Sequence, residues 1–88
     1  MKKYYYEFVT SWEIDEDIQY AYAYVFADTV NEGRQTIKKA FPDIEVLNYA
    51  RTDSKDYSDT FKEYYEGIVK LWFVDRNKIE HHITREVI

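Results

Sequence analysis

The chain has 88 residues, a formal net charge of −5, 19% aromatic residues and no cysteine. This length predicts a single domain over residues 1–88, and the lack of cysteine excludes a disulfide framework and thiolate metal sites. No window reaches the roughly 20 apolar residues of a membrane span, and no apolar run follows the basic start. We therefore expect a soluble, cytoplasmic protein that does not contact a membrane.

The formal charge is concentrated in the first third of the chain. Residues 34–88 hold ten acids and ten bases, whereas residues 1–33 hold seven acids against Lys2 and Lys3. No Lys or Arg occurs between positions 4 and 33. A one-sided negative field attracts a basic partner and repels nucleic acid.

Two alternating segments predict a β-hairpin at the start of the chain. Residues 4–12 and 18–27 alternate as strands do, and the second carries rings on its even positions and Ala or Val on its odd ones over most of its length. We expect a five-residue loop over 13–17. In that register Phe8 faces Tyr22, and the aromatic side chains of both strands form one ladder.

A helix is predicted after Asp28, which can cap its first turn. Apolar residues then recur at helical spacing as far as Pro42, which cannot continue a helix: Val30, Gly33, Ile37, Ala40 and Phe41. Because Gly33 lies on this apolar stripe, we expect the helix to approach the sheet closely there. The small residues of the second strand suit such an approach, so we expect the helix on the alanine face and the aromatic ladder on the other face.

Three more strands are predicted over residues 44–52, 68–75 and 79–87. A polar loop is predicted over 53–60. Residues 61–66 fit both a helical spacing and an alternating one, and we favour a long strand.

The last two strands are expected to form a hairpin. Arg76-Asn77 suits a two-residue turn, which sets Val74 opposite Ile79 and Trp72 opposite His81. The predicted fold class is α+β with the order β-β-α-β-β-β. It is an antiparallel-rich sheet of about five strands with one helix on one face. This order of the first elements resembles that of β-grasp domains.

Motifs for catalysis are weak. Pro42-Asp43 followed by Asp53-Ser54-Lys55 resembles the spelling of the PD-(D/E)xK nuclease motif. The two acids bracket one predicted strand, however, and ten residues at about 3.3 Å each would separate them by about 33 Å. We therefore expect the chain not to be an enzyme.

Motifs for metal binding are also weak. Adjacent His81 and His82 point to opposite faces of a strand, and we expect one to pack near Trp72 and the other to lie in solvent. A metal site built from Glu80, His82 and another acid is an open alternative. The acidic run at 15–17 lacks the Gly and the final Glu of an EF-hand loop. We expect neither a metal nor another cofactor.

The leading hypothesis is a non-catalytic binding or inhibitory protein that engages a basic protein surface. The predicted partner-binding residues are acids and rings of the first hairpin: Glu7, Trp12, Glu13, Asp15, Glu16, Asp17, Tyr20 and Tyr22. In size, acidity and lack of a catalytic set, the chain resembles small phage or mobile-element inhibitors, including anti-CRISPR proteins that imitate DNA. The resemblance implies a CRISPR effector or another nucleic-acid enzyme as the target, in the cytoplasm of a host cell.

Two other classes stay open. One is a small assembly module that self-associates through its Tyr-rich face or an edge strand, and the other is an enzyme or metal protein that uses His81 or His82. The aromatic face could also be core under another layer. Stacking of nucleic acid on that face requires a positive groove, which the net charge disfavours.

Overall fold

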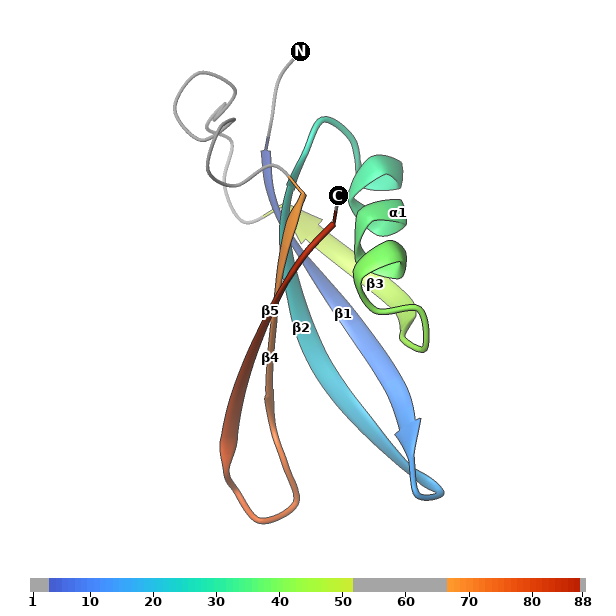
Figure 1. The fold of residues 1–88 in the computed structure, drawn as a ribbon, viewed down its shortest axis with the longest axis vertical. Helices are drawn as coiled ribbons and strands as arrows, with labels where there is room; N and C mark the ends of the chain where they lie inside the picture. The colour runs from blue at the N-terminus through green and yellow to red at the C-terminus, as the bar shows by residue number, and fades with distance from the viewer. Residues whose placement is uncertain (1–3, 52–66, 88) are drawn as a thin grey trace.

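The computed structural model describes residues 4–51 and 67–87, which form an antiparallel sheet of five strands with a helix against one face (Figure 1). The sheet order is β3-β1-β2-β4-β5. The elements are β1 (Tyr4–Ile14), β2 (Asp17–Ala27), α1 (Val30–Ala40), β3 (Glu45–Arg51), β4 (Ile68–Val74) and β5 (Glu80–Glu86). These elements confirm the α+β class. The loop predicted over 53–60 and the strand favoured at 61–66 lie outside the described residues.

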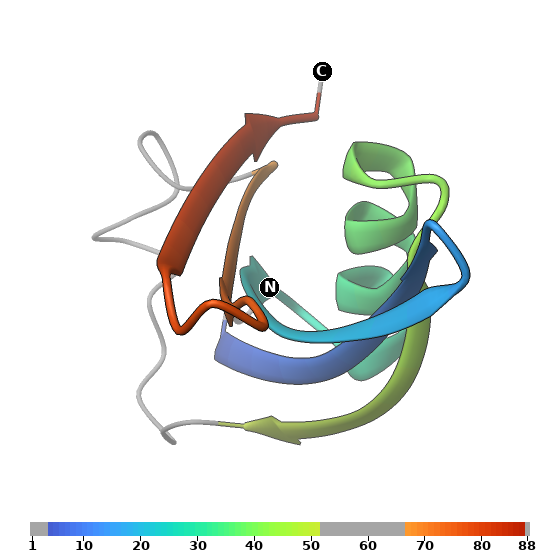
Figure 2. The same cartoon turned by 90° about the horizontal axis from the view of Figure 1, so that it is seen from below.

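The sheet curves around α1, which lies in its hollow (Figure 2). The core fills the space between them, and its largest fully buried side chains are Phe8, Thr10, Val25, Ile37, Val69 and Leu71. Burying rings and branched aliphatic side chains in this way supplies most of the stability of a small domain. The buried hydroxyl of Thr10 is satisfied, because it donates to the carbonyl of Ala21 at 3.0 Å.

The helix approaches the sheet closely at Gly33, as predicted. A Cβ atom on Gly33 would lie 3.1 Å from the ring of Phe8 and 3.3 Å from Val25. The predicted cap at Asp28 is wrong by one residue: the hydroxyl of Thr29 accepts from the backbone N–H of Glu32 at 3.1 Å. A capping side chain accepts a hydrogen bond from the backbone N–H two or three residues further on. Thr29 is three residues before Glu32 and is therefore the cap.

The predicted register of the first hairpin is wrong. The turn has two residues, Asp15 and Glu16, with φ of 49° and 70°, and Phe8 faces Ala23 instead of Tyr22. Two-residue turns with positive φ match the natural twist of paired strands, which favours this turn over a five-residue loop. A slip of one residue turns every side chain of a strand to the other face.

The single aromatic ladder is therefore also wrong. The even-numbered rings of β1, including Tyr6 and Phe8, share the concave face with the alanines of β2 and lie under α1. The rings of β2, from Tyr20 to Phe26, lie on the convex face. The helix does cover the alanine face, as predicted.

The register of the last hairpin differs from the prediction by one residue as well. Three residues, 76–78, form its loop, with Lys78 at a φ of 64°. The carboxylate of Asp75 accepts from the backbone N–H groups of Asn77 and Ile79 and so stabilises this loop. As a result, β5 shifts by one residue: Trp72 faces His82, and Val74 faces Glu80.

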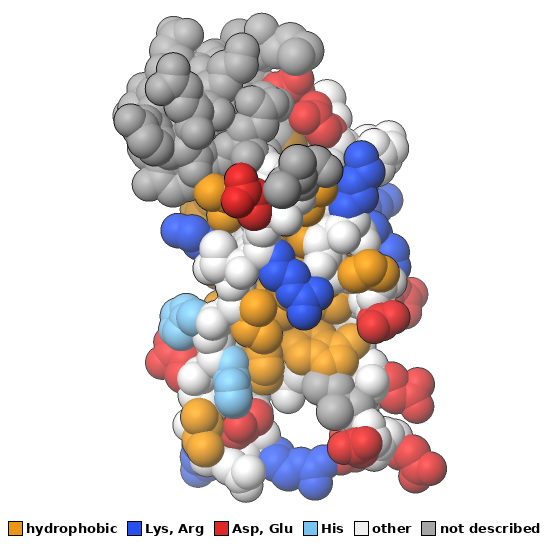
Figure 3. Space-filling model, viewed as in Figure 1, with side chains coloured by type: hydrophobic (Ala, Val, Ile, Leu, Met, Phe, Trp, Pro, Cys, Tyr) orange, Lys and Arg blue, Asp and Glu red, His pale blue; other side chains and the backbone are white. Residues whose placement is uncertain are grey.

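A seam between β5 and α1 is closed by Arg85. Its Nη1 atom donates to the carbonyl of Ala40 at 2.9 Å, and its guanidinium lies 4.5 Å from the centre of the Phe41 ring. A cation at the C-terminus of a helix is favourable because the carbonyls there carry partial negative charge. Hydrophobic side chains gather at this seam between β5 and α1 (Figure 3). The contacts of Arg85 with Ala40 and Phe41 connect β5 to the end of α1, so its role is structural.

Candidate functional site

The β1–β2 turn carries four of the predicted acids at one end of the molecule. Glu13, Asp15, Glu16 and Asp17 are all exposed, and they form the acidic tip (Figure 3). Asp17 forms an ion pair with Arg76 of the β4–β5 loop. The pair is well exposed on both sides, so it contributes at most about 1 kcal/mol to stability. Its effect on the charge of the tip is clearer, since it offsets one of the four carboxylates.

The other three acids of the first third lie elsewhere. Glu7 is in the middle of β1, whereas Asp28 and Glu32 lie at the start of α1, beyond the far end of β2. A strand of eleven residues spans about 35 Å, so the two ends of β2 are well separated. The seven acids all occur in the first third of the sequence, but they do not form one patch.

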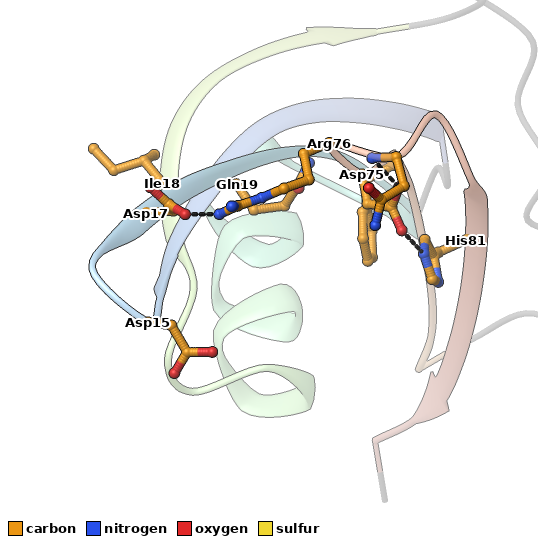
Figure 4. Close-up of a pocket in the computed structure, with 9 residues that line it drawn as sticks. Asp15, Asp17, Ile18, Gln19, Asp75, Arg76 and His81 are labelled. Atoms are coloured by element: carbon orange, nitrogen blue, oxygen red, sulfur yellow. Dashed lines mark hydrogen bonds and ion pairs between the residues drawn. The ribbon is translucent and has the colours of Figure 1, made fainter.

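A cleft of about 780 Å³ lies between the two hairpin ends (Figure 4). It exists because β2 pairs with β4 only from Tyr22 to Val25, and the hairpins then diverge. The ion pair of Asp17 and Arg76 joins the two hairpins across this cleft. The Nε2 atom of His81 lies 2.7 Å from Asp75 on the β4–β5 side.

The two histidines point to opposite faces, as predicted, but His82 lies opposite Trp72 in place of His81. His81 stacks on the ring of Phe73 with centroids 4.6 Å apart, whereas the exposed His82 lies opposite Trp72 and 2.8 Å from Glu80. The hydrogen bond with His81, followed by the backbone bond from Ile79, holds the pKa of Asp75 below its ordinary value.

Within the described ranges, no three His, Asp or Glu side chains come together as a metal site. Asp43 lies between α1 and β3, outside both elements. The second half of the nuclease-like spelling, Asp53-Ser54-Lys55, falls outside the described residues.

The convex face of the sheet carries stacked and exposed rings. Tyr22 stacks on Trp72 with centroids 5.7 Å apart. Tyr5 stacks on both Tyr24 and Phe26, at 5.6 Å and 4.7 Å. Tyr20 is 60% exposed at the end of this face that adjoins the acidic tip, and its neighbour Ile18 is 64% exposed. An exposed apolar surface of this kind is typical of a contact surface.

Two carboxylates are hydrogen-bonded to these rings. Glu7 accepts from the hydroxyl of Tyr24 at 2.8 Å, and Glu80 accepts from the indole nitrogen of Trp72 at 2.6 Å. The bonds from Trp72 and then His82 lower the pKa of Glu80, so it stays ionised near neutral pH. Sequence reasoning considered Glu80 only for a metal site and Trp72 only as the neighbour of a histidine. Trp72 reaches the rings of β2 because β2 pairs with β4, and Glu80 shares its face because of the observed register of β4 and β5.

The predicted site residues divide between the two faces. Tyr20, Tyr22 and Glu7 lie on the convex face, and the acidic tip adjoins it. Trp12 lies on the concave face instead, where it packs edge-on against Phe73 with centroids 4.9 Å apart. The inclusion of Trp12 in one surface with Tyr20 and Tyr22 is therefore wrong, and the cause is again the register of the first hairpin.

The phenol of Tyr24 is expected to titrate late. Burial, followed by the hydrogen bond to Glu7, raises its pKa to about 12 from an ordinary value of 10.0. The neutral phenol thus contributes stability that is fully present below pH 10 and is lost as the pH rises through 12. Glu7→Gln should lower this pKa, since it removes the charge that opposes ionisation. Carbon-13 NMR of the tyrosine ring can follow the titration, and an unchanged pKa in Glu7→Gln would contradict this account.

Comparisons of the chain with family models, with curated proteins and with solved structures give no match. In the part of the chain that is described, no helix has the length and apolar character needed to span a membrane.

Proposed function

We propose that this chain is a non-catalytic binding protein whose partner presents a basic surface. One observation carries the proposal: the exposed acidic tip is continuous with exposed rings of the convex face. Glu13 lies opposite Ile18 in the hairpin, and Tyr20 follows on the same face. A contact surface of this composition provides both long-range attraction and apolar area to bury.

The two parts of this surface have different physical roles. Exposed carboxylates such as Asp15 and Glu16 accelerate encounter with a basic protein, because the attraction acts before contact. Rings such as Tyr20 and Tyr22 lose exposed area on contact and slow dissociation, as aromatic residues do at interface hot spots. Binding should therefore depend on salt through its association rate more than through its dissociation rate.

We propose further that the partner is a nucleic-acid enzyme, such as a CRISPR effector, and that this chain inhibits it. Such enzymes hold phosphates in positively charged grooves. The first hairpin carries Glu13, Asp15 and Glu16 at its end. Two paired strands are narrow enough to enter a groove, where these carboxylates would take the place of phosphates. The similarity in size and acidity to small inhibitors that imitate DNA supports this particular choice.

Charge reversal at the tip tests the proposal. Asp15→Lys/Glu16→Lys should weaken binding at low salt by about tenfold and reduce its salt dependence, because steering is lost while the Asp17–Arg76 pair remains. The matched control is Glu32→Lys/Glu86→Lys, which changes the net charge equally but away from the tip, since Glu32 lies in the first turn of α1 and Glu86 lies at the end of β5 opposite to the β4–β5 loop. The measurement is capture from a lysate of the source organism at low and high salt, followed by calorimetric titration of the captured protein.

Two results would contradict the proposal. One is capture of a partner that is not basic and does not elute with salt. The other is equal weakening in the tip variant and in its control, which would show that only net charge matters.

A second candidate function is self-association, favoured by the 60% exposure of Tyr20 and the 64% exposure of Ile18. Two convex faces could bury this apolar area against each other. Sedimentation equilibrium separates the candidates: a stable oligomer that captures no basic protein favours assembly.

A further inference from the structure

The convex face places a carboxylate beside stacked rings in two separate places. The first, here named the β2–β4 ring site, consists of Tyr22, Trp72 and Glu80. The second, the β1–β2 ring site, consists of Tyr5, Tyr24 and Glu7. In each site a carboxylate is fixed by a hydrogen bond from one of the rings. A carboxylate accepts several hydrogen bonds, so each retains capacity for an external donor.

Flat rings with an adjacent carboxylate suit one side chain above others. The guanidinium of arginine is planar and weakly hydrated, stacks on aromatic faces and donates two parallel bonds to a carboxylate. The ammonium of lysine is a compact and strongly hydrated charge that gains less from a ring. A site with both components therefore distinguishes arginine from lysine, whereas an acidic patch alone does not.

The charge on this face agrees with a cationic occupant. Pairing between the described strands puts five carboxylates on the convex face: Glu7, Glu13, Glu45, Glu80 and Glu86. The lysine on the same face, Lys70, lies opposite Tyr24. His82 also lies here, and it is 2.8 Å from Glu80. Five acids against one lysine leave the described part of this face strongly negative.

The spacing of the sites indicates the form of the partner. Tyr22 and Tyr24 are two residues apart on β2, and two residues of a strand span about 6.8 Å. An extended segment repeats its side chains on one face at the same interval. Two arginines separated by one residue would therefore meet Tyr22 and Tyr24, one at each site. Their carboxylate partners lie on opposite sides of β2, because Glu80 belongs to β5 and Glu7 to β1.

We propose that the convex face binds arginine side chains of an extended basic segment, one at each ring site. The inference rests on the proposed function, because it names the chemistry of the basic partner. It also goes further, since the proposed function would hold equally for a lysine-rich surface.

Two synthetic peptides test the inference. One alternates arginine with serine over eight residues, and the other replaces each arginine with lysine. Both are acetylated and amidated so that they differ only in the cationic group. Tryptophan fluorescence and NMR titration report binding near Trp72. We expect the arginine peptide to bind at least fivefold more tightly than the lysine peptide.

Variants locate the preference. Tyr22→Leu should reduce the arginine-to-lysine ratio toward one while keeping the salt dependence, because the stacking surface is lost and the charges remain. Glu80→Gln should weaken the binding of both peptides. Tyr49→Leu is the matched control: Tyr49 is 47% exposed, but it packs on Phe8 at the concave face. Circular dichroism of each variant verifies that the fold is intact.

The outcomes separate the two proposals. Equal binding of both peptides overturns the arginine sites while the basic partner stands, and no binding of either peptide also overturns them. An arginine preference that decreases in Tyr22→Leu but is unchanged in Tyr49→Leu supports the sites, even where no basic protein is captured from the lysate. If the arginine preference is found but no basic protein is captured, the proposed function is overturned while the arginine sites are supported.

Discussion

Replacing Phe8 with alanine is expected to lower the free energy of unfolding by about 3–5 kcal/mol. Phe8 is fully buried on β1, an inner strand of the sheet, and its ring contacts the position at Gly33 where α1 lies close against the sheet. Removing the ring leaves a cavity bounded by the helix and by Tyr6 and Tyr49, whose rings lie 6.1 Å away. Such a cavity cannot close easily, because the curved sheet fixes the distance to α1.

Urea unfolding followed by tryptophan fluorescence measures this loss. The midpoint should fall while the slope with denaturant stays nearly constant, since the surface exposed on unfolding changes little. Tyr20→Ala is the control, because Tyr20 is a ring on the adjacent strand that is 60% exposed. It should cost about 1 kcal/mol or less. A similar loss in both variants would contradict the assignment of Phe8 to the core.

Replacing Gly67 with alanine is expected to destabilise the protein by about 2–4 kcal/mol. Gly67 precedes β4 with a φ of 77°, a conformation that L-residues with a side chain rarely adopt. An added Cβ would lie 2.6 Å from the carbonyl oxygen of Val87, which is backbone and cannot rotate away. The N–H of Val87 donates to the carbonyl of Gly67 at 2.6 Å, so this contact also closes the open end of the β4–β5 hairpin.

Gly33→Ala is the matched control for this substitution. Its added Cβ meets the ring of Phe8 at 3.1 Å, but a residue in mid-helix also gains about 1 kcal/mol when Gly becomes Ala. The two effects oppose each other, so the loss of stability in Gly33→Ala should be smaller than in Gly67→Ala. Thermal unfolding of both variants makes the comparison, and a smaller loss at Gly67 than at Gly33 would contradict it.

Local patterns in the sequence were enough to predict the elements. The alternation in β1 and β2, the helical stripe that ends before Pro42 and the strong strand at β4 all appear in the structure within a few residues of their predicted bounds. The close approach at Gly33 was also predictable, because glycine weakens a helix and suits an apolar stripe mainly where a neighbouring element comes near. These features depend on neighbours in sequence, and a period of 2 or 3.6 residues reports them directly.

The candidate site was only partly predictable. The acids of the tip are exposed as expected, but Trp12 was assigned to the wrong surface, and Trp72 and Glu80 were not among the predicted partner-binding residues. The errors at Trp12 and Glu80 have the same origin, a register that differs by one residue in a hairpin. Trp72 joins the rings of β2 through the pairing of β2 with β4, which no local pattern in the sequence specifies. The ion pair between Asp17 and Arg76 was equally out of reach, since it joins two turns that are 59 positions apart in the sequence.

The sequence by itself determined which segments are strands and helix, where the acids cluster along the chain, and which strand face is small enough to receive the helix. The tertiary structure decided which rings share a surface. The reason is physical: periodicity defines the two faces of each strand, but the turn between strands determines which faces coincide. At Asp15-Glu16 and at residues 76–78 that choice depended on backbone twist and on hydrogen bonds within the turn, and it placed the rings of β2 and β4 beside Glu7 and Glu80 on one convex face.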